Sequence, residues 1–137
     1  MRFFKLPALL LCAVFALSCS SVPTNIPDTI TPAKLVQRAQ EASDRNRYKL
    51  SLGYYEEILK RFPEDNDYVC AAEYEIGFIH YKQRKYDIAG SELRELLGKY
   101  DQSDAELLPP QYKILANIVI AKIDERSMMG TKVPRRK

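Results

Sequence analysis

The sequence predicts an all-α fold built from antiparallel helix hairpins. Apolar residues recur every three or four positions over residues 71–82 and again over 86–100, which is the period of amphipathic helices. Only residues 83–86 connect the apolar faces of these two segments, which is enough for no more than a tight turn, so the second helix must turn back along the first. A similar pattern occurs 38 positions earlier, where Tyr48 corresponds to Tyr86. The hairpin is therefore expected to be repeated.

The first 18 residues have the pattern of an export signal. Basic residues stand at the start, and an apolar run over 6–17 is too short for a comfortable membrane span. Residues 16–19, Ala-Leu-Ser-Cys, resemble the bacterial lipobox, although Ala16 replaces the commoner Leu. The resemblance implies that the chain is cut just before Cys19 and that this cysteine is diacylated. Ordinary signal peptidase cleavage nearby is the alternative.

Residues 19–31 are expected to form a flexible tether after the lipidated Cys19, because this part is rich in Ser, Thr and Pro and has no periodicity. Thr31 followed by Pro32 is a good helix start, so a polar helix is expected over 33–44. A helical domain is thus expected over 32–126.

A stronger helix is predicted over residues 48–62. Its apolar residues share one face, and Glu56/Lys60 and Glu57/Arg61 are spaced for ion pairs on the other. The buried face comprises Leu52, Tyr55, Ile58, Leu59 and Phe62. The repeat of 38 positions is longer than a standard helix hairpin unit, and the additional residues are expected in a loop at 63–68.

The repeated hairpin resembles a tetratricopeptide repeat (TPR), a helix-turn-helix unit that stacks into a solenoid. Ile76-Gly77 match its Leu-Gly pair, and residues 86–89 match its Tyr-Asp-x-Ala pattern, whereas Glu73 and Asp101 depart from the usual Trp and Pro. The further matching positions are His80, Leu93 and Leu96. The resemblance implies a short TPR-like α-solenoid of about two and a half repeats, in which Gly77 lets two helices approach closely. The Arg-Phe-Pro ending at 61–63 is similar to BamD-like lipoproteins of the beta-barrel assembly machinery and to periplasmic cell-division coordinators.

The C-terminal part is expected to hold a capped single turn, a last helix and a basic tail. Ser103 and Glu106 are spaced for a capping box, and the helix is predicted over 111–126 with Leu115-Ala116 at the Leu-Gly position. This helix has apolar residues on too many sides for one narrow face. Either another chain covers it, with Ile118 and Ile120 as candidates for self-association in a homo-dimer, or Met128, Met129 and Val133 fold back over it. Residues 127–137 would be the tail, either solvated or in contact with anionic lipid or an acidic protein surface.

Catalytic and metal chemistry find few candidates in this chain. The chain has one His, and the only cysteine expected in the mature domain is Cys70, which should be a buried small residue. The pairs Glu73/Glu75 and Glu56/Glu57 are expected to face water. We therefore predict no enzyme activity, cofactor or metal. Removal of residues 1–18 would take away two basic residues and lower the formal charge from +3 to +1. This near-neutral charge and the predicted export argue against nucleic acid as a partner.

The functional surface is then expected to be a binding surface on the concave side, which the first helix of each repeat lines. Tyr74, Phe78 and Tyr81 could grip an extended segment or a helix of a partner, or they could simply be core. The full inward set by register is Gln40, Ser43, Asp44, Tyr74, Phe78, Tyr81, Lys82, Lys113, Asn117 and Ile120.

Together these features predict a lipid-anchored, periplasm-facing adaptor or scaffold of the bacterial cell envelope. It would bind envelope proteins or peptide segments, with the outer membrane favoured over the inner and outer-membrane protein assembly as one setting. The alternative is a small-ligand-binding accessory subunit of an envelope transport system.

Overall fold

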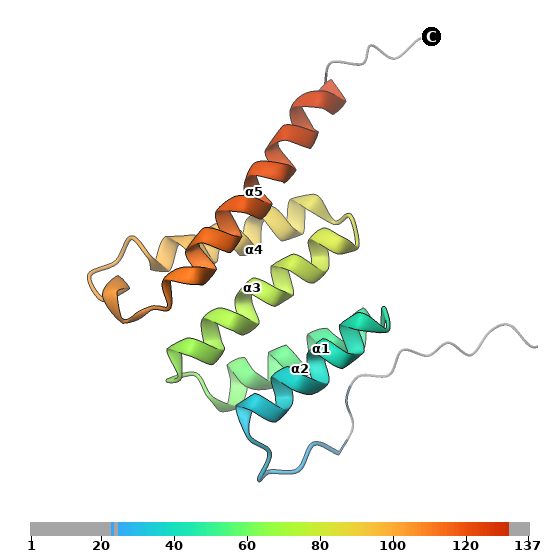
Figure 1. The fold of residues 1–137 in the computed structure, drawn as a ribbon, viewed down its shortest axis with the longest axis vertical. Helices are drawn as coiled ribbons and strands as arrows, with labels where there is room; N and C mark the ends of the chain where they lie inside the picture. Colours follow the sequence, from blue (N-terminus) through green and yellow to red (C-terminus); the bar gives the residue numbers. More distant parts are fainter. Residues whose placement is uncertain (1–22, 24, 132–137) are drawn as a thin grey trace, which may run out of the picture.

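The computed structural model describes residue 23 and residues 25–131, so the predicted signal peptide, Cys19 and the cations at 132–137 lie outside the described residues. The described part is all α-helical, with no strand, as the sequence predicts. Its elements are α1 (Pro32–Asp44), α2 (Tyr48–Arg61), α3 (Asn66–Lys82), α4 (Tyr86–Lys99), the short 3-10 helix η1 (Ala105–Leu107) and α5 (Pro110–Thr131). Figure 1 shows α1 paired with α2 and α3 with α4, and α5 packs on α4 and α3. None of these helices is both long and apolar enough to span a bilayer.

The turns of the two hairpins are built alike. Asn46 and Arg84 both have a positive φ, of 56° and 62°, which is uncommon for residues other than glycine. The next residue donates its backbone N–H back into the first helix in both cases, Arg47 to the Ala42 carbonyl and Lys85 to the His80 carbonyl. The helices that follow, α2 and α4, have 14 residues each. The correspondence between Tyr48 and Tyr86 therefore extends to backbone geometry.

Small residues allow the helices of each hairpin to approach closely. A Cβ atom on Gly77 would lie 2.8 Å from Leu93 Cγ and Cδ2, so α3 and α4 meet here as predicted. Ala89 is fully buried at the same crossing. In the first hairpin, buried Ser51 donates a 2.8 Å hydrogen bond to the Ala39 carbonyl and so joins α2 to α1.

Helix α3 contributes to two hydrophobic clusters. One side of α3 closes the first hairpin with Ala72 and Ile79, and another closes the second with Cys70 and Tyr74. The first cluster comprises Ile30, Leu35, Ala39, Tyr55, Ile58, Ala72 and Ile79. The second comprises Cys70, Tyr74, Ala89, Leu93, Leu96, Tyr100, Ala116, Val119 and Ile123. The central helix therefore links the two halves of the domain.

Two predicted boundaries and one predicted helix cap are wrong. Helix α3 begins at Asn66, because the Asp65 side chain caps it by accepting from the Tyr68 N–H, so the loop at 63–68 is shorter than expected. The capping box of Ser103 and Glu106 does not form, since η1 has no side-chain cap. Helix α5 continues to Thr131, five residues beyond the predicted end and into the expected tail.

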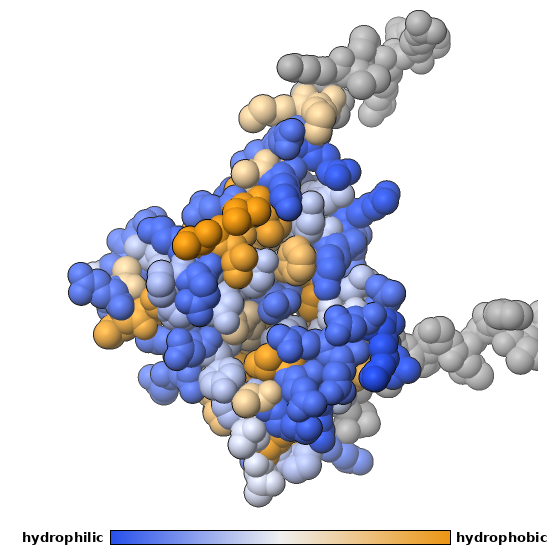
Figure 2. Space-filling model, in the orientation of Figure 1, coloured by the Kyte–Doolittle hydropathy of each residue, from blue (hydrophilic) through white to orange (hydrophobic). Residues whose placement is uncertain are grey.

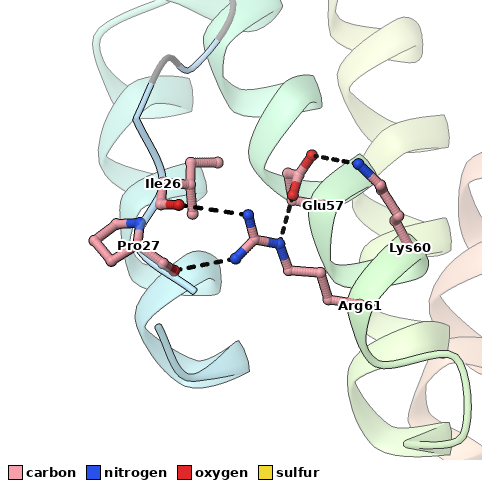
Figure 3. Close-up of polar contacts among 5 residues, drawn as sticks. All are labelled: Ile26, Pro27, Glu57, Lys60 and Arg61. Carbon is pink, nitrogen blue, oxygen red and sulfur yellow. Dashed lines mark hydrogen bonds and ion pairs between the residues drawn. The ribbon is translucent and has the colours of Figure 1, made fainter. Parts of the chain in front are cut away.

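The end of the predicted tether is fastened to the first hairpin. Ile30 is buried in the first cluster and Ile26 packs against it. Figure 3 shows the Arg61 guanidinium between this segment and α2: it donates to the Pro27 carbonyl at 3.0 Å, to the Ile26 carbonyl at 3.5 Å and to Glu57 at 2.7 Å. The prediction of flexibility is therefore wrong for residues 26–30, because two isoleucines and an arginine hold them in place.

Candidate binding face of α1, α3 and α5

One face of the molecule is formed by the first helices of the hairpins and by α5. Figure 1 is viewed from this side, with α1, α3 and α5 nearer to the reader than α2 and α4. From the same side, Figure 2 shows a hydrophobic patch over α5. The large hydrophobic residues that α5 exposes along its first half are Ile114 (62%), Leu115 (37%) and Ile118 (47%). We call the surface of α1, α3 and α5 on this side the front face.

Five aromatic rings form a continuous ladder beside this patch. Tyr74, Phe78 and Tyr81 are spaced to share one side of α3. Their rings stack in order, with centroids 5.8 Å and 6.0 Å apart. Tyr112 of α5 continues the ladder at 5.9 Å from Tyr74, and Tyr86 of α4 continues it at 5.7 Å from Tyr81. The ladder therefore joins α5 to the centre of the front face.

Tyr74, Phe78 and Tyr81 differ in solvent exposure, which shows which of them are core residues and which could also contact a partner. Tyr74 is only 8% exposed and belongs to the second core cluster. Phe78 and Tyr81 pack against this cluster but remain half-buried. Tyr74 is thus core, whereas Phe78 and Tyr81 also present part of their surface.

Lys82 is held in place at the α1 side of the ladder. Its ammonium group donates to the Ser43 hydroxyl at 2.5 Å and lies 5.3 Å from the ring centroids of both Tyr48 and Phe78. A cation over two aromatic faces is favourable and fixes the lysine side chain. The predicted residues Gln40 and Asp44 are exposed on α1. The structure therefore brings the α3 candidates together with Ser43.

The predicted register of α5 is wrong. Lys113 lies 5.8 Å over the Tyr100 ring, in a hollow that η1 also lines. Asn117 donates its side-chain amide to the Lys113 carbonyl of its own helix. Ile120 is half-buried against the second core cluster, so it is not free for self-association. Ile118, by contrast, is exposed.

The side of α5 that packs against the rest of the domain is centred on the small residue Ala116. Tyr112, Ala116, Val119 and Ile123 have helical spacing, and they pack on the second cluster or belong to it. Ile114 and Ile118 then fall outside this stripe. Ala116 was the signal in the sequence, because only a small residue fits where two helices approach closely. Met128 and Met129 continue the helix and are exposed, so they do not fold back.

Two carboxylates expected in water are half-buried. Glu73 forms a 2.5 Å ion pair with Lys99 of α4. Glu75 forms no hydrogen bond or ion pair with any described residue. Burial raises the pKa of Glu75, an effect that Lys82 opposes and Asp44 reinforces. In the other predicted pair, Glu57 is also half-buried and binds Arg61.

Tyr55 of α2 has a buried hydroxyl on which the charge of Glu75 acts. The residue is 1% exposed, and its hydroxyl has no hydrogen-bond partner among the described residues. Burial raises its pKa, and the negative charge of Glu75 raises it further. The sequence analysis identified Tyr55 only as an apolar core residue. Its spacing predicts that the ring is buried but not whether the hydroxyl finds a hydrogen-bond partner.

His80 and Cys70, the residues best suited to catalysis by type, have structural positions. His80 Nδ1 lies 2.7 Å from Glu92 Oε2 and so links α3 to α4. Cys70 is buried and free, and burial raises the pKa of its thiol, which lowers its reactivity. Among residues 25–131, no group of three or more His, Cys, Asp or Glu could hold a metal ion.

A hollow of about 490 Å³ lies away from these features. Residues 61–67 and Leu107 line it, and none of the ladder residues does. The hollow therefore does not extend the front face.

A comparison with known proteins finds a similar chain in a bacterium. A curated protein of Treponema pallidum (strain Nichols), described as an uncharacterized protein, is 34% identical over 116 residues. The match covers 83% of this chain and 46% of the relative, so the chain spans about half the length of the protein it matches. No family model and no solved structure matches.

Proposed function

We propose that this chain is a non-catalytic adaptor of the bacterial cell envelope that binds segments of partner proteins on its front face. The acyl group on Cys19 would anchor it to a membrane, with the helical domain on the periplasmic side. The domain would be a short TPR-like solenoid, in which α1/α2 and α3/α4 are complete units and α5 begins a third. The resemblance of its sequence to tetratricopeptide repeats and to lipoproteins of the beta-barrel assembly machinery makes outer-membrane protein assembly the setting that we propose.

The shared geometry of the two hairpins supports the repeat assignment. Both turns have a left-handed residue at the same position, and Ala89 is buried at the crossing where the motif requires a small residue. Units of this kind present their first helices side by side, which creates an extended recognition surface.

The observation that carries the binding proposal is the exposed apolar surface of α5 beside the aromatic ladder. Ile114 and Ile118 are large, β-branched and about half exposed, and they lie in the first half of a well-packed helix. Exposed apolar patches next to aromatic residues are typical of protein interaction sites. A segment lying across the front face would cover both isoleucines and the open parts of Phe78 and Tyr81.

A matched pair of substitutions tests this proposal. Ile118→Lys charges the front face, and Ile88→Lys charges α4 at a residue of almost equal exposure, 47% against 48%. Ile88 shares a helical stripe with Glu92 and Glu95, which line a hollow together with Leu59 of α2, so it lies away from the front face. Each full-length variant would be affinity-purified from solubilised envelopes of the cells that make it.

We expect discrete envelope proteins to co-purify with the wild type and with Ile88→Lys and to be lost with Ile118→Lys. Circular dichroism would verify that both variants keep their helical content. Equal recovery of these proteins with both variants would contradict the proposal.

A further inference from the structure

The front face contains a carboxylate whose charge nothing in the described chain neutralises directly. Glu75 lies on α3 one turn before Phe78 and two turns before Lys82, and it is half-buried. Partial burial raises the free energy of the charged form of a carboxylate, and a bound cation would offset this cost. Glu75 forms neither an ion pair nor a hydrogen bond with any described residue.

The nearest cation does not fill this role. The Lys82 ammonium group donates to Ser43 and lies over the rings of Tyr48 and Phe78. It forms no ion pair with Glu75, although its charge acts on that carboxylate from a distance. Asp44, at the end of α1, adds negative charge to the same region.

Tyr55 gives an independent sign that the polar arrangement here is incomplete. Within the described part of the chain its hydroxyl is fully buried without a donor or an acceptor. Burial raises the pKa of this hydroxyl and the negative charge of Glu75 raises it further, although no hydrogen bond joins the two side chains. Buried polar groups without partners are rare in proteins and call for a specific explanation.

We propose that Glu75 accepts a lysine or arginine side chain from the bound partner segment. The inference rests on the proposed function, since it names the chemistry that the front face recognises. The cation would pair with Glu75, while apolar residues beside it in the segment would cover Ile114 and Ile118. Arginine suits this position because its planar group binds a carboxylate through two parallel hydrogen bonds. The partner is thus a protein segment with a basic residue flanked by apolar ones.

The test uses random dodecapeptides displayed on phage, selected against the mature full-length chain. We expect the selected peptides to share a lysine or arginine next to apolar residues. One such peptide, made synthetically, should bind Glu75→Gln about tenfold or more weakly than the wild type, because a charge-assisted pair is lost. Glu95→Gln, which alters an exposed carboxylate of α4, should bind as the wild type does.

A second peptide has the basic residue replaced by norleucine. It separates loss of the ion pair with Glu75 from other effects of Glu75→Gln on binding. It should bind the wild type and Glu75→Gln equally, which a purely structural role of Glu75 would not produce. Selected peptides without a basic residue, or undiminished binding by Glu75→Gln, would overturn this inference.

Ile118→Lys distinguishes this failure from a failure of the proposed function. If Ile118→Lys abolishes binding while Glu75→Gln does not, the front face still binds peptide and only the role of Glu75 is wrong. If Ile118→Lys binds the peptide as the wild type does, the proposed function is wrong as well. Failure to select any peptide would contradict both.

Discussion

At the scale of single residues, the closest helix contact depends on Gly77. A Cβ atom at this position would lie 2.8 Å from two carbons of Leu93, which is fully buried and cannot move aside easily. Gly77→Ala should therefore lower the free energy of unfolding by about 1–3 kcal/mol, as overpacking of a dense core does. Urea denaturation followed by circular dichroism measures this change.

Gly98→Ala is the matched control. Gly98 lies in α4 with nothing within 4 Å of an added Cβ, so alanine should stabilise the helix by roughly 0.5–1 kcal/mol. Equal effects of the two substitutions would show that the close approach of α3 and α4 is not as described.

Glu75 should make stability depend on pH in an unusual direction. Burial raises its pKa in the folded state, so the folded protein binds its proton more tightly than the unfolded chain does. Stability is then lost as the pH rises from the ordinary value of 4.5 through the raised pKa. Glu75→Gln should therefore stabilise the protein at pH 7, and the gain should disappear below pH 4.5.

Urea denaturation of the wild type and Glu75→Gln at both pH values measures the difference. Glu95→Gln, at an exposed position, should show no comparable gain at neutral pH. A destabilising effect of Glu75→Gln at pH 7 would mean that the carboxylate has a stabilising partner.

At the scale of helices, the sequence predicted the elements with clear one-sided patterns and failed where the pattern was ambiguous. The helices that begin at Tyr48 and Tyr86 start where expected, because their apolar stripes and the short turns before them agree. In α5, apolar residues occur on nearly every side, so spacing alone could not identify the buried side. The candidates Lys113 and Asn117 were chosen from the wrong register for this reason. Burial of Glu75 could not be predicted either, since it depends on how neighbouring helices cover α3.

The N-terminal segment before α1 gives a prediction at the same scale. Arg61→Ala removes a guanidinium that donates to the carbonyls of Ile26 and Pro27. These contacts are partly exposed, so their loss should cost only roughly 1 kcal/mol. Exchange of the Ile30 amide hydrogen, which is bonded to the Pro27 carbonyl, should become about fivefold faster.

Lys60→Ala serves as the control for this change. Lys60 also pairs with Glu57, at 3.7 Å, but it does not contact the segment (Figure 3). Hydrogen exchange at Ile30 that is unchanged in Arg61→Ala, or equally fast in both variants, would show that Arg61 does not hold residues 26–30 in place.

At the scale of the whole molecule, α3 connects the two hydrophobic clusters to the front face. One side of α3 closes the first cluster and another closes the second. Its remaining side holds Glu75, Phe78 and Lys82 on the front face. Two sides of α3 are therefore buried in the clusters, and its third side remains available for the proposed binding role.

The predicted anchor determines where this surface would operate. Each buried methylene of an acyl chain contributes about 0.8 kcal/mol, so two or more chains on Cys19 would hold the protein at a membrane. In cells that make the protein, Cys19→Ser should abolish incorporation of labelled palmitate and move the protein from the membrane fraction to the soluble one. Membrane retention and labelling that survive the substitution would contradict lipidation at this residue.

The binding role of the front face is tested most directly by photo-cross-linking in living cells. A photoreactive amino acid would replace Ile118 of α5 in one strain and Ile88 of α4 in another, since the two side chains are almost equally exposed. The account predicts adducts of discrete mass with envelope proteins at position 118 and none at position 88. The same adducts at both positions, or none at position 118, would contradict it.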